Sequence, residues 1–337
     1  MLSAYGFPFL FATLISYVLT PYIRKIAFRI GAIDRPDNRK VHKKIMPRLG
    51  GLAIYIAFVI AVAASLEFSQ DIIGIMAGGT VIAAVGVLDD KYQLPARLKL
   101  LGQIFAAAIL VLFGIQIEWV NNPLGGYFYL DYLSVPFTVF WVVAMTNVVN
   151  LIDGLDGLAA GVSAIASLTV LLVAAQMGYY HVAVMTAALA GGIIGFIRYN
   201  FNPATIFMGD TGSMFLGYML AAVSVYGAVK TAATVALIVP AIALGLPIMD
   251  TAFAIMRRYS NGHPIFQPDK GHLHHRLLAM GMNQRQAVLL MYGITAALSI
   301  GAVLWAEFDG FWASVIIAAI ITAVAVGAKK IGILNDR

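Results

Sequence analysis

The sequence predicts an all-α protein that crosses a membrane many times. Of its 337 residues, 61% are hydrophobic and only 11% are charged, and the mean hydropathy is +0.87. Soluble domains carry roughly 25% charged residues, so this chain is too apolar to be one of them. Apolar runs close to the length of a membrane-spanning helix recur from end to end. The basic residues gather in alternate polar segments between these runs.

We count eleven apolar runs, each of which is expected to be a membrane-spanning helix. They cover approximately 7–23, 49–66, 72–88, 98–117, 135–151, 158–177, 182–197, 213–229, 232–256, 287–305 and 311–326. The first run lacks a basic segment before it and is followed by "RKIAFR" rather than by a small-residue cleavage site, so we interpret it as a retained helix and not as a signal peptide. No repeat of fixed period is visible, and we expect one integral domain over 1–337.

The basic residues predict an orientation. If all eleven runs span the membrane, every Lys and Arg except Lys230 falls on the same side. Cytoplasmic loops carry the excess of basic residues, so we expect the N-terminus outside and the C-terminus in the cytoplasm. This rule also accounts for the net charge of +6 without a nucleic-acid partner.

Two further features bound the chemistry. The chain has no cysteine, which excludes disulfides, a thiol nucleophile and thiolate metal sites. The outer segment 118–134 alternates aromatic residues around Pro-Leu-Gly-Gly, a pattern that fits either a short β-hairpin at the membrane surface or an aromatic-belt loop.

The acidic residues point to one side of the membrane. The outer loops mix Glu and Asp, whereas all ten acids on the expected cytoplasmic side are Asp. Two of them, Asp89 and Asp90, end an apolar run in "VIAAVGVLDD". A charged Asp at the bilayer centre costs roughly 2.5 to 3.5 kcal/mol, so we place the pair at the cytoplasmic end of its helix. A solvated helix end is the alternative, although a helix C-terminus disfavours anions.

The segment "NVVNLIDGLDGLAAG" places Asn147, Asn150 and Asp153 at intervals of three residues, so they are able to share one helix face. The glycines that follow predict that the helix ends near Asp153 in a turn that lets backbone approach a ligand. Asp156 would lie on that turn. Amide and carboxylate oxygens suit Mg²⁺, whereas the simpler alternative is a glycine-rich loop with solvated acids.

Two more loops add an acid and a basic cluster. Asp210 lies between glycines in "TIFMGDTGS", on the same expected side as the other Asp residues. The segment "DKGHLHHRL" brings together His274, His275 and Arg276, which suit phosphate oxygens as charged donors. Topology or anionic lipid would also explain such basic residues. Asp-rich and basic loops on one face indicate a reaction between phosphoryl groups bridged by Mg²⁺, and the apolar body indicates a lipid substrate.

These motifs resemble the polyprenyl-phosphate N-acetylhexosamine-1-phosphate transferases, the family that includes MraY, WecA and TagO. The resemblance covers nearly the whole chain and rests on six segments in order: "MPRLGG", "GVLDD", "LPARLK", "NVVNLIDGLDGLAAG", "FMGDTGS" and "GHLHHRL". It implies transfer of a sugar 1-phosphate from a UDP-sugar to a polyprenyl phosphate, with release of UMP. It also implies Mg²⁺ as cofactor, with Mn²⁺ as a substitute, and a site on the cytoplasmic face of a bacterial plasma membrane.

The resemblance also implies a role for each matching residue. Asp210 is expected to be the principal metal ligand, joined by Asn150. Asp89 is expected to deprotonate or orient the lipid phosphate, with Asp90 beside it. The nucleotide and sugar end is assigned to Asp153, Asp156, Asn147 and Phe207, the last stacking on uracil. The phosphate-binding group is assigned to Lys99, His274, His275, Arg276, Lys44 and Arg48.

Two departures from the MraY pattern indicate the branch. Arg276 stands where MraY-type proteins have a third consecutive His, and Gln93 stands where they have Lys. Both features resemble the WecA and TagO branch, so the expected substrates are UDP-GlcNAc and undecaprenyl phosphate. Transfer of phospho-MurNAc-pentapeptide is the alternative. A homodimer is compatible with the sequence.

Two rivals of other classes are weaker. A CDP-alcohol phosphotransferase would share "DGLAA", but Ala160 replaces the Arg of that motif. A secondary transporter would use Asp250 beside Pro247, with Pro240 as a helix break, but it leaves the clustering of Asp and His on one face unexplained.

Overall fold

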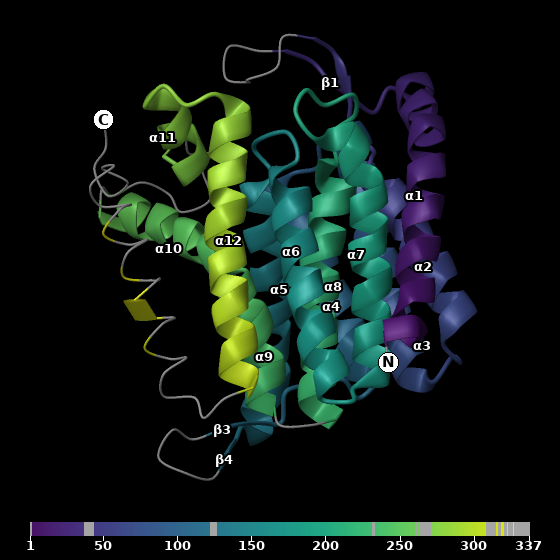
Figure 1. Cartoon of the computed structure of the whole chain (residues 1–337), viewed down its shortest axis with the longest axis vertical. Coiled ribbons are helices and arrows are strands. Elements are labelled where there is room, and N and C mark those ends of the chain that lie inside the picture. The colour runs from purple at the N-terminus through teal and green to yellow at the C-terminus, as the bar shows by residue number, and fades with distance from the viewer. Residues whose placement is uncertain are drawn as a thin grey trace.

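The computed structural model describes residues 2–36, 44–121, 127–230, 233–260, 262, 271–307, 315, 318, 319, 322 and 326. Within these residues the regular structure is almost entirely helical (Figure 1). Seven of the described helices are long and apolar enough to cross a membrane, and a bent pair adds an eighth. Large apolar side chains are exposed on the outer helices, as expected where helices face lipid. The chain is therefore an all-α polytopic membrane protein.

The first ten predicted runs coincide with helices, and the eleventh, 311–326, lies mostly outside the described residues. The helices are α1 (Leu2–Ile30), α2 (Gly51–Ser65), α3 (Gln70–Tyr92), α4 (Ala96–Leu112), α5 (Ser134–Ile152), α6 (Leu158–Gln176), α7 (Tyr180–Asn200), α8 (Gly209–Lys230), α9 (Ala233–Ala243), α10 (Gly245–Ser260), α11 (Leu273–Ala279) and α12 (Gln284–Glu307).

Two short antiparallel ribbons lie at opposite ends of the bundle (Figure 1). At the upper end, β1 (Ile33–Asp34) pairs with β2 (Met46–Pro47). At the lower end, β3 (Trp119–Asn121) pairs with β4 (Tyr127–Tyr129), so of the two alternatives for 118–134 the structure shows the β-hairpin pairing. A single 3₁₀ turn, Asp131–Leu133, then leads into α5.

The ninth predicted span is not one straight helix. It divides at Leu244 into α9 and α10, which are bent by 73°. The physical reason is Pro247, whose ring nitrogen cannot donate to the carbonyl one turn earlier, at Ala243. As a result, α10 lies across the bundle instead of continuing along it (Figure 1).

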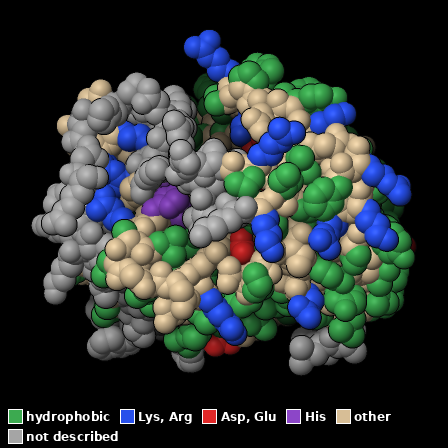
Figure 2. Space-filling model, turned by 90° about the horizontal axis from the view of Figure 1, so that it is seen from above, with side chains coloured by type: hydrophobic (Ala, Val, Ile, Leu, Met, Phe, Trp, Pro, Cys, Tyr) green, Lys and Arg blue, Asp and Glu red, His purple; other side chains and the backbone are tan. Residues whose placement is uncertain are grey.

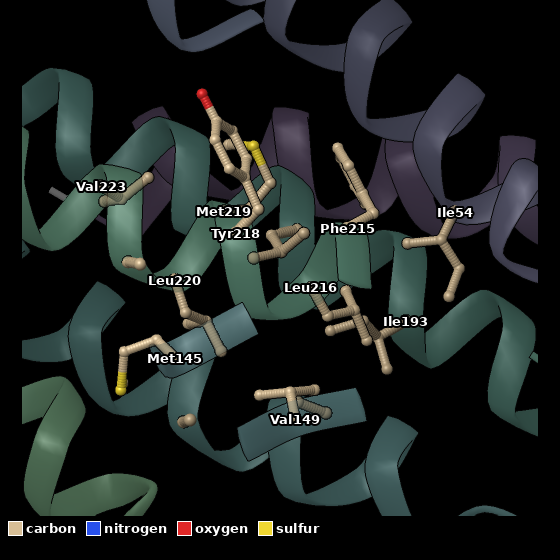
Figure 3. Close-up of a cluster of buried hydrophobic side chains, with 14 of the residues drawn as sticks. Ile54, Met145, Val149, Ile193, Phe215, Leu216, Tyr218, Met219, Leu220 and Val223 are labelled. Carbon is tan, nitrogen blue, oxygen red and sulfur yellow. The ribbon is translucent and has the colours of Figure 1, made fainter. Parts of the chain in front are cut away.

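Helix α8 is the centre of the packing. Of the described membrane-spanning helices it is the most deeply buried, with 94% of its apolar stretch inside the protein. Figure 3 shows its side chains Phe215, Leu216 and Met219 among residues of neighbouring helices, including Ile54 and Val149. Such a fully enclosed helix gives its first turn a fixed place at the upper end of the bundle.

Small residues bring the neighbouring helices close to the first turn of α8. A Cβ on Gly51, at the start of α2, would overlap the backbone of Gly212. A Cβ on Gly86, in α3, would overlap the backbone of Thr211. The start of α2 and the end of α3 are therefore held directly against the start of α8. Figure 2 shows this upper end, with Lys and Arg side chains scattered over the face and His and one acidic side chain visible among them near its middle.

Candidate active site

A cavity of about 670 Å³ lies among the loops at the upper end. Its wall comes from the β1–β2 ribbon, the turn after α5, the α7–α8 loop and the first residues of α11 and α12. The residues that line it are Asp34, Lys44, Met46, Arg48, Asp153, Gly154, Leu155, Asp156, Asn200, Asn202, Pro203, Ala204, Phe207, Met208, Gly209, Asp210, His275 and Gln284. Four of these are Asp and two are Lys or Arg, so an anionic substrate would need an added cation to bind here.

The two adjacent carboxylates of α3 have different surroundings. The Oδ1 of Asp90 accepts hydrogen bonds from Arg48 Nε at 3.1 Å and from the Asp210 N–H at 2.9 Å. Its Oδ2 accepts from the backbone N–H of Thr211 at 3.1 Å and from the Thr211 hydroxyl at 2.6 Å. Asp90 thus caps the first turn of α8, where a carboxylate is favoured by the free N–H groups. Gly209, at φ +73°, allows the close approach, because a Cβ there would meet the Asp90 carboxylate.

Asp89 instead faces the cations of the site. Its Oδ1 accepts from the backbone N–H of Leu94 at 2.8 Å. Its Oδ2 lies 3.5 Å from Lys99 Nζ, and the same ammonium is 2.7 Å from Asp210 Oδ2. Lys99 therefore bridges Asp89 and Asp210, which come from helices 121 residues apart in the sequence.

Arg48 links the carboxylates from the opposite side. Besides the Asp90 bond, its guanidinium lies 3.6 Å from Asp89, 3.9 Å from Asp210 and 3.7 Å from Asp34. Burial alone would lower the pKa of Arg48, but the charges of Asp90 and Asp210 raise it above its ordinary value. Arg48 is thus a permanent positive charge at the floor of the cavity.

The donor set fits a divalent cation that prefers oxygen. Ligand atoms of Asp89, Asp90 and Asp210 all lie within 4.8 Å of one another. Asp90 is already occupied by four donors, so Asp89 and Asp210 are the carboxylates that remain for an ion such as Mg²⁺. Asn150 Nδ2 donates to Ser213 Oγ at 2.8 Å, which leaves the amide oxygen as its ligand atom, and Ser213 is one turn into α8 from Asp210.

Asp153 lies in the cavity wall directly after α5. Burial there, with the nearby charges of Asp210 and Asp90, raises the pKa of Asp153 to about 8. A cation at this end of the cavity would lower the pKa of Asp153 and favour the ionised carboxylate. The raised pKa of Asp153 is therefore consistent with a cation bound by the oxygen ligands described above.

The turn after Asp153 is tied down from three directions. Asp156 Oδ2 accepts from Asn202 Nδ2 at 3.1 Å and from the Ala204 N–H at 3.0 Å, and Asn202 also donates to Gln284 at 2.8 Å. Gly157 has φ +80°, and its carbonyl accepts from the Tyr292 hydroxyl of α12. The helix end and glycine turn expected here are confirmed, and Asp156 lines the cavity while bracing the α7–α8 loop.

Phe207 and Lys44 also line the cavity. Phe207 is fixed by its backbone, since its N–H donates to Pro47 and its carbonyl accepts from Gly50. The exposed Lys44 lies at the start of the described segment that leads into β2. Both positions are compatible with the expected contacts to a nucleotide and to phosphate.

Asn147 is not among the residues that line the cavity, and its assignment to the nucleotide end stays a prediction. Its Nδ2 donates to Gln103 Oε1 at 2.7 Å, and Gln103 Nε2 donates back to Asn147 Oδ1 at 3.3 Å. Side chains three residues apart drift by about 60° around a helix, so Asn147 faces α4 rather than the loops.

The basic cluster of α11 is divided as well. His275 lines the cavity, whereas His274 is buried against Gly154. Burial and the neighbouring His275 lower the pKa of His274 to about 3, which favours the neutral ring. Arg276 Nε donates to the Gly271 carbonyl at 3.3 Å and is not part of the cavity wall.

Four polar residues of the cavity wall were missed: Asp34, Asn200, Asn202 and Gln284. Asp34 belongs to the all-Asp side of the membrane, which is the one signal that pointed to it. Asn202 and Gln284 meet across 82 residues of sequence, and no local pattern reveals such a contact.

Comparisons with known proteins show which family the chain belongs to. Residues 72–228 match the family model described as "Glycosyl transferase family 4". The chain is 42% identical to the "Probable undecaprenyl-phosphate N-acetylglucosaminyl 1-phosphate transferase" of Bacillus subtilis, over 98% of this chain and 92% of the relative. It is 37% identical to the "Decaprenyl-phosphate N-acetylglucosaminephosphotransferase" of Mycolicibacterium smegmatis, over 94% and 86%.

A relative from the alternative branch is less similar. The "Phospho-N-acetylmuramoyl-pentapeptide-transferase" of a Thermoanaerobacter species is 32% identical, over 84% of this chain and 94% of the relative. The difference favours the branch indicated by Arg276 and Gln93. The chain belongs to the polyprenyl-phosphate N-acetylhexosamine-1-phosphate transferase family, and within it to the branch of WecA and TagO.

Proposed function

We propose that this protein transfers GlcNAc-1-phosphate from UDP-GlcNAc to undecaprenyl phosphate, giving undecaprenyl-diphosphate-GlcNAc and UMP. This is the first membrane step of a cell-envelope glycopolymer such as teichoic acid or O-antigen. The observation that carries the proposal is the cluster of Asp89, Asp210, Lys99 and Arg48 in a helix bundle, in which Asp210 and Arg48 line the cavity and Lys99 and Asp89 are paired with them. Such a cluster suits two anionic substrates, one of them a lipid.

The cofactor in this proposal is Mg²⁺, for which Mn²⁺ substitutes. Asp210 would hold the ion, with the amide oxygen of Asn150 and an oxygen of Asp89 as further ligands. When bound, the ion would neutralise charge on the phosphates and polarise the one that reacts.

The residues of the chain position the two substrates for direct attack. Asp89 orients the lipid phosphate or removes its proton, and Lys99 and Arg48 offset the negative charge that gathers between the substrates. An oxygen of the lipid phosphate bonds to the β-phosphorus of UDP-GlcNAc as the bond to the bridging oxygen breaks, and UMP leaves. Phe207 and Asp156 hold the nucleotide, and His275 with Lys44 contacts the phosphates.

The proposal includes the setting of the site. The protein has eleven spans in the plasma membrane of a bacterium, with the N-terminus outside, the C-terminus inside and the cavity open to the cytoplasm. The many Lys and Arg side chains on the upper end support this orientation (Figure 2). The whole chain, 1–337, forms one domain, and a homodimer is compatible with it.

A comparison of two sugar donors, supplied separately, tests the proposal. Purified protein in detergent is given undecaprenyl phosphate, Mg²⁺ and either UDP-GlcNAc or UDP-MurNAc-pentapeptide, and the lipid-linked product is measured by chromatography. We expect product from UDP-GlcNAc alone. Product from the pentapeptide donor alone would assign the protein to the alternative activity.

Metal removal tests the cofactor. Dialysis against EDTA should abolish product formation, and added Mg²⁺ or Mn²⁺ should restore it. Full activity after EDTA treatment would exclude a divalent ion from the mechanism.

A further inference from the structure

A buried hydrogen-bonded pair, Asp250 and His272, joins α10 to the start of α11. Asp250 Oδ2 lies 2.8 Å from His272 Nδ1, and Asp250 Oδ1 accepts from the backbone N–H of Leu273 at 2.8 Å. Asp250 is 5% exposed and His272 is 6% exposed. Asp250 therefore satisfies the first free N–H of α11 from another helix, the place where a capping carboxylate is most favourable.

The residue before this pair is also fixed. The Gly271 carbonyl accepts from Arg257 Nη1 at 3.2 Å and from Arg276 Nε at 3.3 Å. A Cβ on Gly271 would overlap the Arg257 guanidinium. The backbone entering α11 is thus held on its carbonyl side by arginine and on its N–H side by Asp250.

The imidazole rings of His272 and His274 connect this anchored backbone to the cavity wall. His272 and His274 stack with their centroids 5.7 Å apart and an angle of 7° between their planes. His274 packs against Gly154, in the turn that bears Asp153, and neither of its ring nitrogens has a hydrogen-bond partner among the described residues. His275, next in sequence, faces the cavity. The position of α11 therefore decides where His275 lies relative to the turn after α5.

We infer that Asp250, acting through His272, is a positioning residue that places His275 in the substrate cavity. Asp250 itself touches no substrate, since it lies on α10 and is not part of the cavity wall. The 73° bend before α10 is what brings Asp250 across to α11. This inference rests on the proposed function, because its measured effect is on the use of UDP-GlcNAc.

A double-mutant cycle tests the inference in the full-length protein. KM for UDP-GlcNAc and kcat are measured for Asp250→Ala, His275→Ala and the double variant. We expect each single variant to lower kcat/KM by roughly 10- to 100-fold, since small misplacements at a site cost this much. The double variant should be little worse than His275→Ala, because Asp250 acts through His275. Additive losses would overturn the inference.

A conservative variant separates positioning from general loss of structure. Asp250→Asn keeps an acceptor for Leu273 and a donor for one tautomer of His272, and Asn caps a helix about as well as Asp. We expect its kcat/KM to stay within about threefold of the wild type. If Asp250→Ala does not fold, His272→Ala replaces it in the cycle and should couple to His275 in the same way.

The matched control is Asp71→Ala, which also removes an Asp side chain, but from the first turn of α3, at the opposite end of that helix from Asp89. Its KM for UDP-GlcNAc should equal that of the wild type. An inactive wild-type protein would refute the proposed function, whereas an active wild type with additive losses refutes only the role of Asp250.

Discussion

At the scale of single residues, adjacent and chemically identical side chains have different tasks. Asp90 accepts four hydrogen bonds and fixes the first turn of α8. Asp89 shares Lys99 with Asp210 and is the member of the pair left for chemistry. In the same way His275 lines the cavity and His274 is buried behind it. Sequence spacing alone does not distinguish the roles of such neighbouring residues.

Arg48 makes contacts in the site that a lysine is unable to reproduce. Its planar group serves Asp90 through Nε and reaches Asp89 and Asp210 through Nη2, whereas Lys has a single nitrogen. We expect Arg48→Lys to lower kcat by roughly 10- to 100-fold with the protein still folded. Steady-state kinetics beside Arg29→Lys, an exposed position on α1, would measure this. Unchanged kcat in Arg48→Lys would show that only its charge matters.

Asn147 should affect stability and not substrate binding. Asn147→Ala leaves the buried amide of Gln103 without its partner, which costs about 1–3 kcal/mol of unfolding free energy. Thermal unfolding in detergent should show the loss, and KM for UDP-GlcNAc should not change. Gln103→Ala should give a similar loss, with little more in the double variant. A raised KM at unchanged stability would return Asn147 to the nucleotide site.

At the scale of elements, the contact between α2 and α8 decides the geometry of the site. Arg48 lies three residues before Gly51, the first residue of α2, and Asp210 is in the first turn of α8, so a shift between these helices separates the cation from its carboxylates. The helices approach through Gly51 and Gly212, where backbone meets backbone and no side chain is able to yield.

Gly51→Ala should therefore force α2 and α8 apart. We expect a loss of at least about 1 to 3 kcal/mol of stability from overpacking and a fall in kcat. Gly293→Ala is the control, because a Cβ there meets nothing within 4 Å. Thermal unfolding and kinetics of both variants give the answer, and equal behaviour of the two would disprove the close contact.

Elements were predictable from the sequence where the signal is local. Hydropathy located the helices under the first ten apolar runs, the ninth of which covers both α9 and α10, and glycine chemistry located the turn after Asp153. The break before α10 was not assigned, because Pro247 lies in an otherwise continuous apolar run and tolerance of proline in such runs depends on neighbouring helices. The partners of Asp90, Asn147 and Asp156 arise from contacts between distant segments, which periodicity does not encode.

At the scale of the whole molecule, the two ends of the helix bundle carry different elements. The cavity, the β1–β2 ribbon and α11 lie at the upper end, whereas the aromatic β3–β4 hairpin lies at the lower end (Figure 1). In the proposed orientation the upper end faces the cytoplasm, where UDP-sugars are present.

The absence of cysteine from the chain makes this orientation easy to test. Tyr132→Cys introduces a thiol at a 98% exposed position after the hairpin, and Met280→Cys does so at a 61% exposed position after α11. In intact cells a membrane-impermeant maleimide should label only the first, and after lysis both. The unsubstituted chain should never be labelled. The reverse pattern in intact cells would invert the topology.

The most direct test of the central claim is the reaction of the purified protein with radiolabelled UDP-GlcNAc, undecaprenyl phosphate and Mg²⁺, compared with Asp210→Asn. Asn keeps the size of the side chain but removes the charge that lies 2.7 Å from Lys99. We expect labelled lipid from the wild type and a yield at least about 100-fold lower from Asp210→Asn. No labelled lipid from the wild type, or an undiminished yield from the variant, would contradict the assignment.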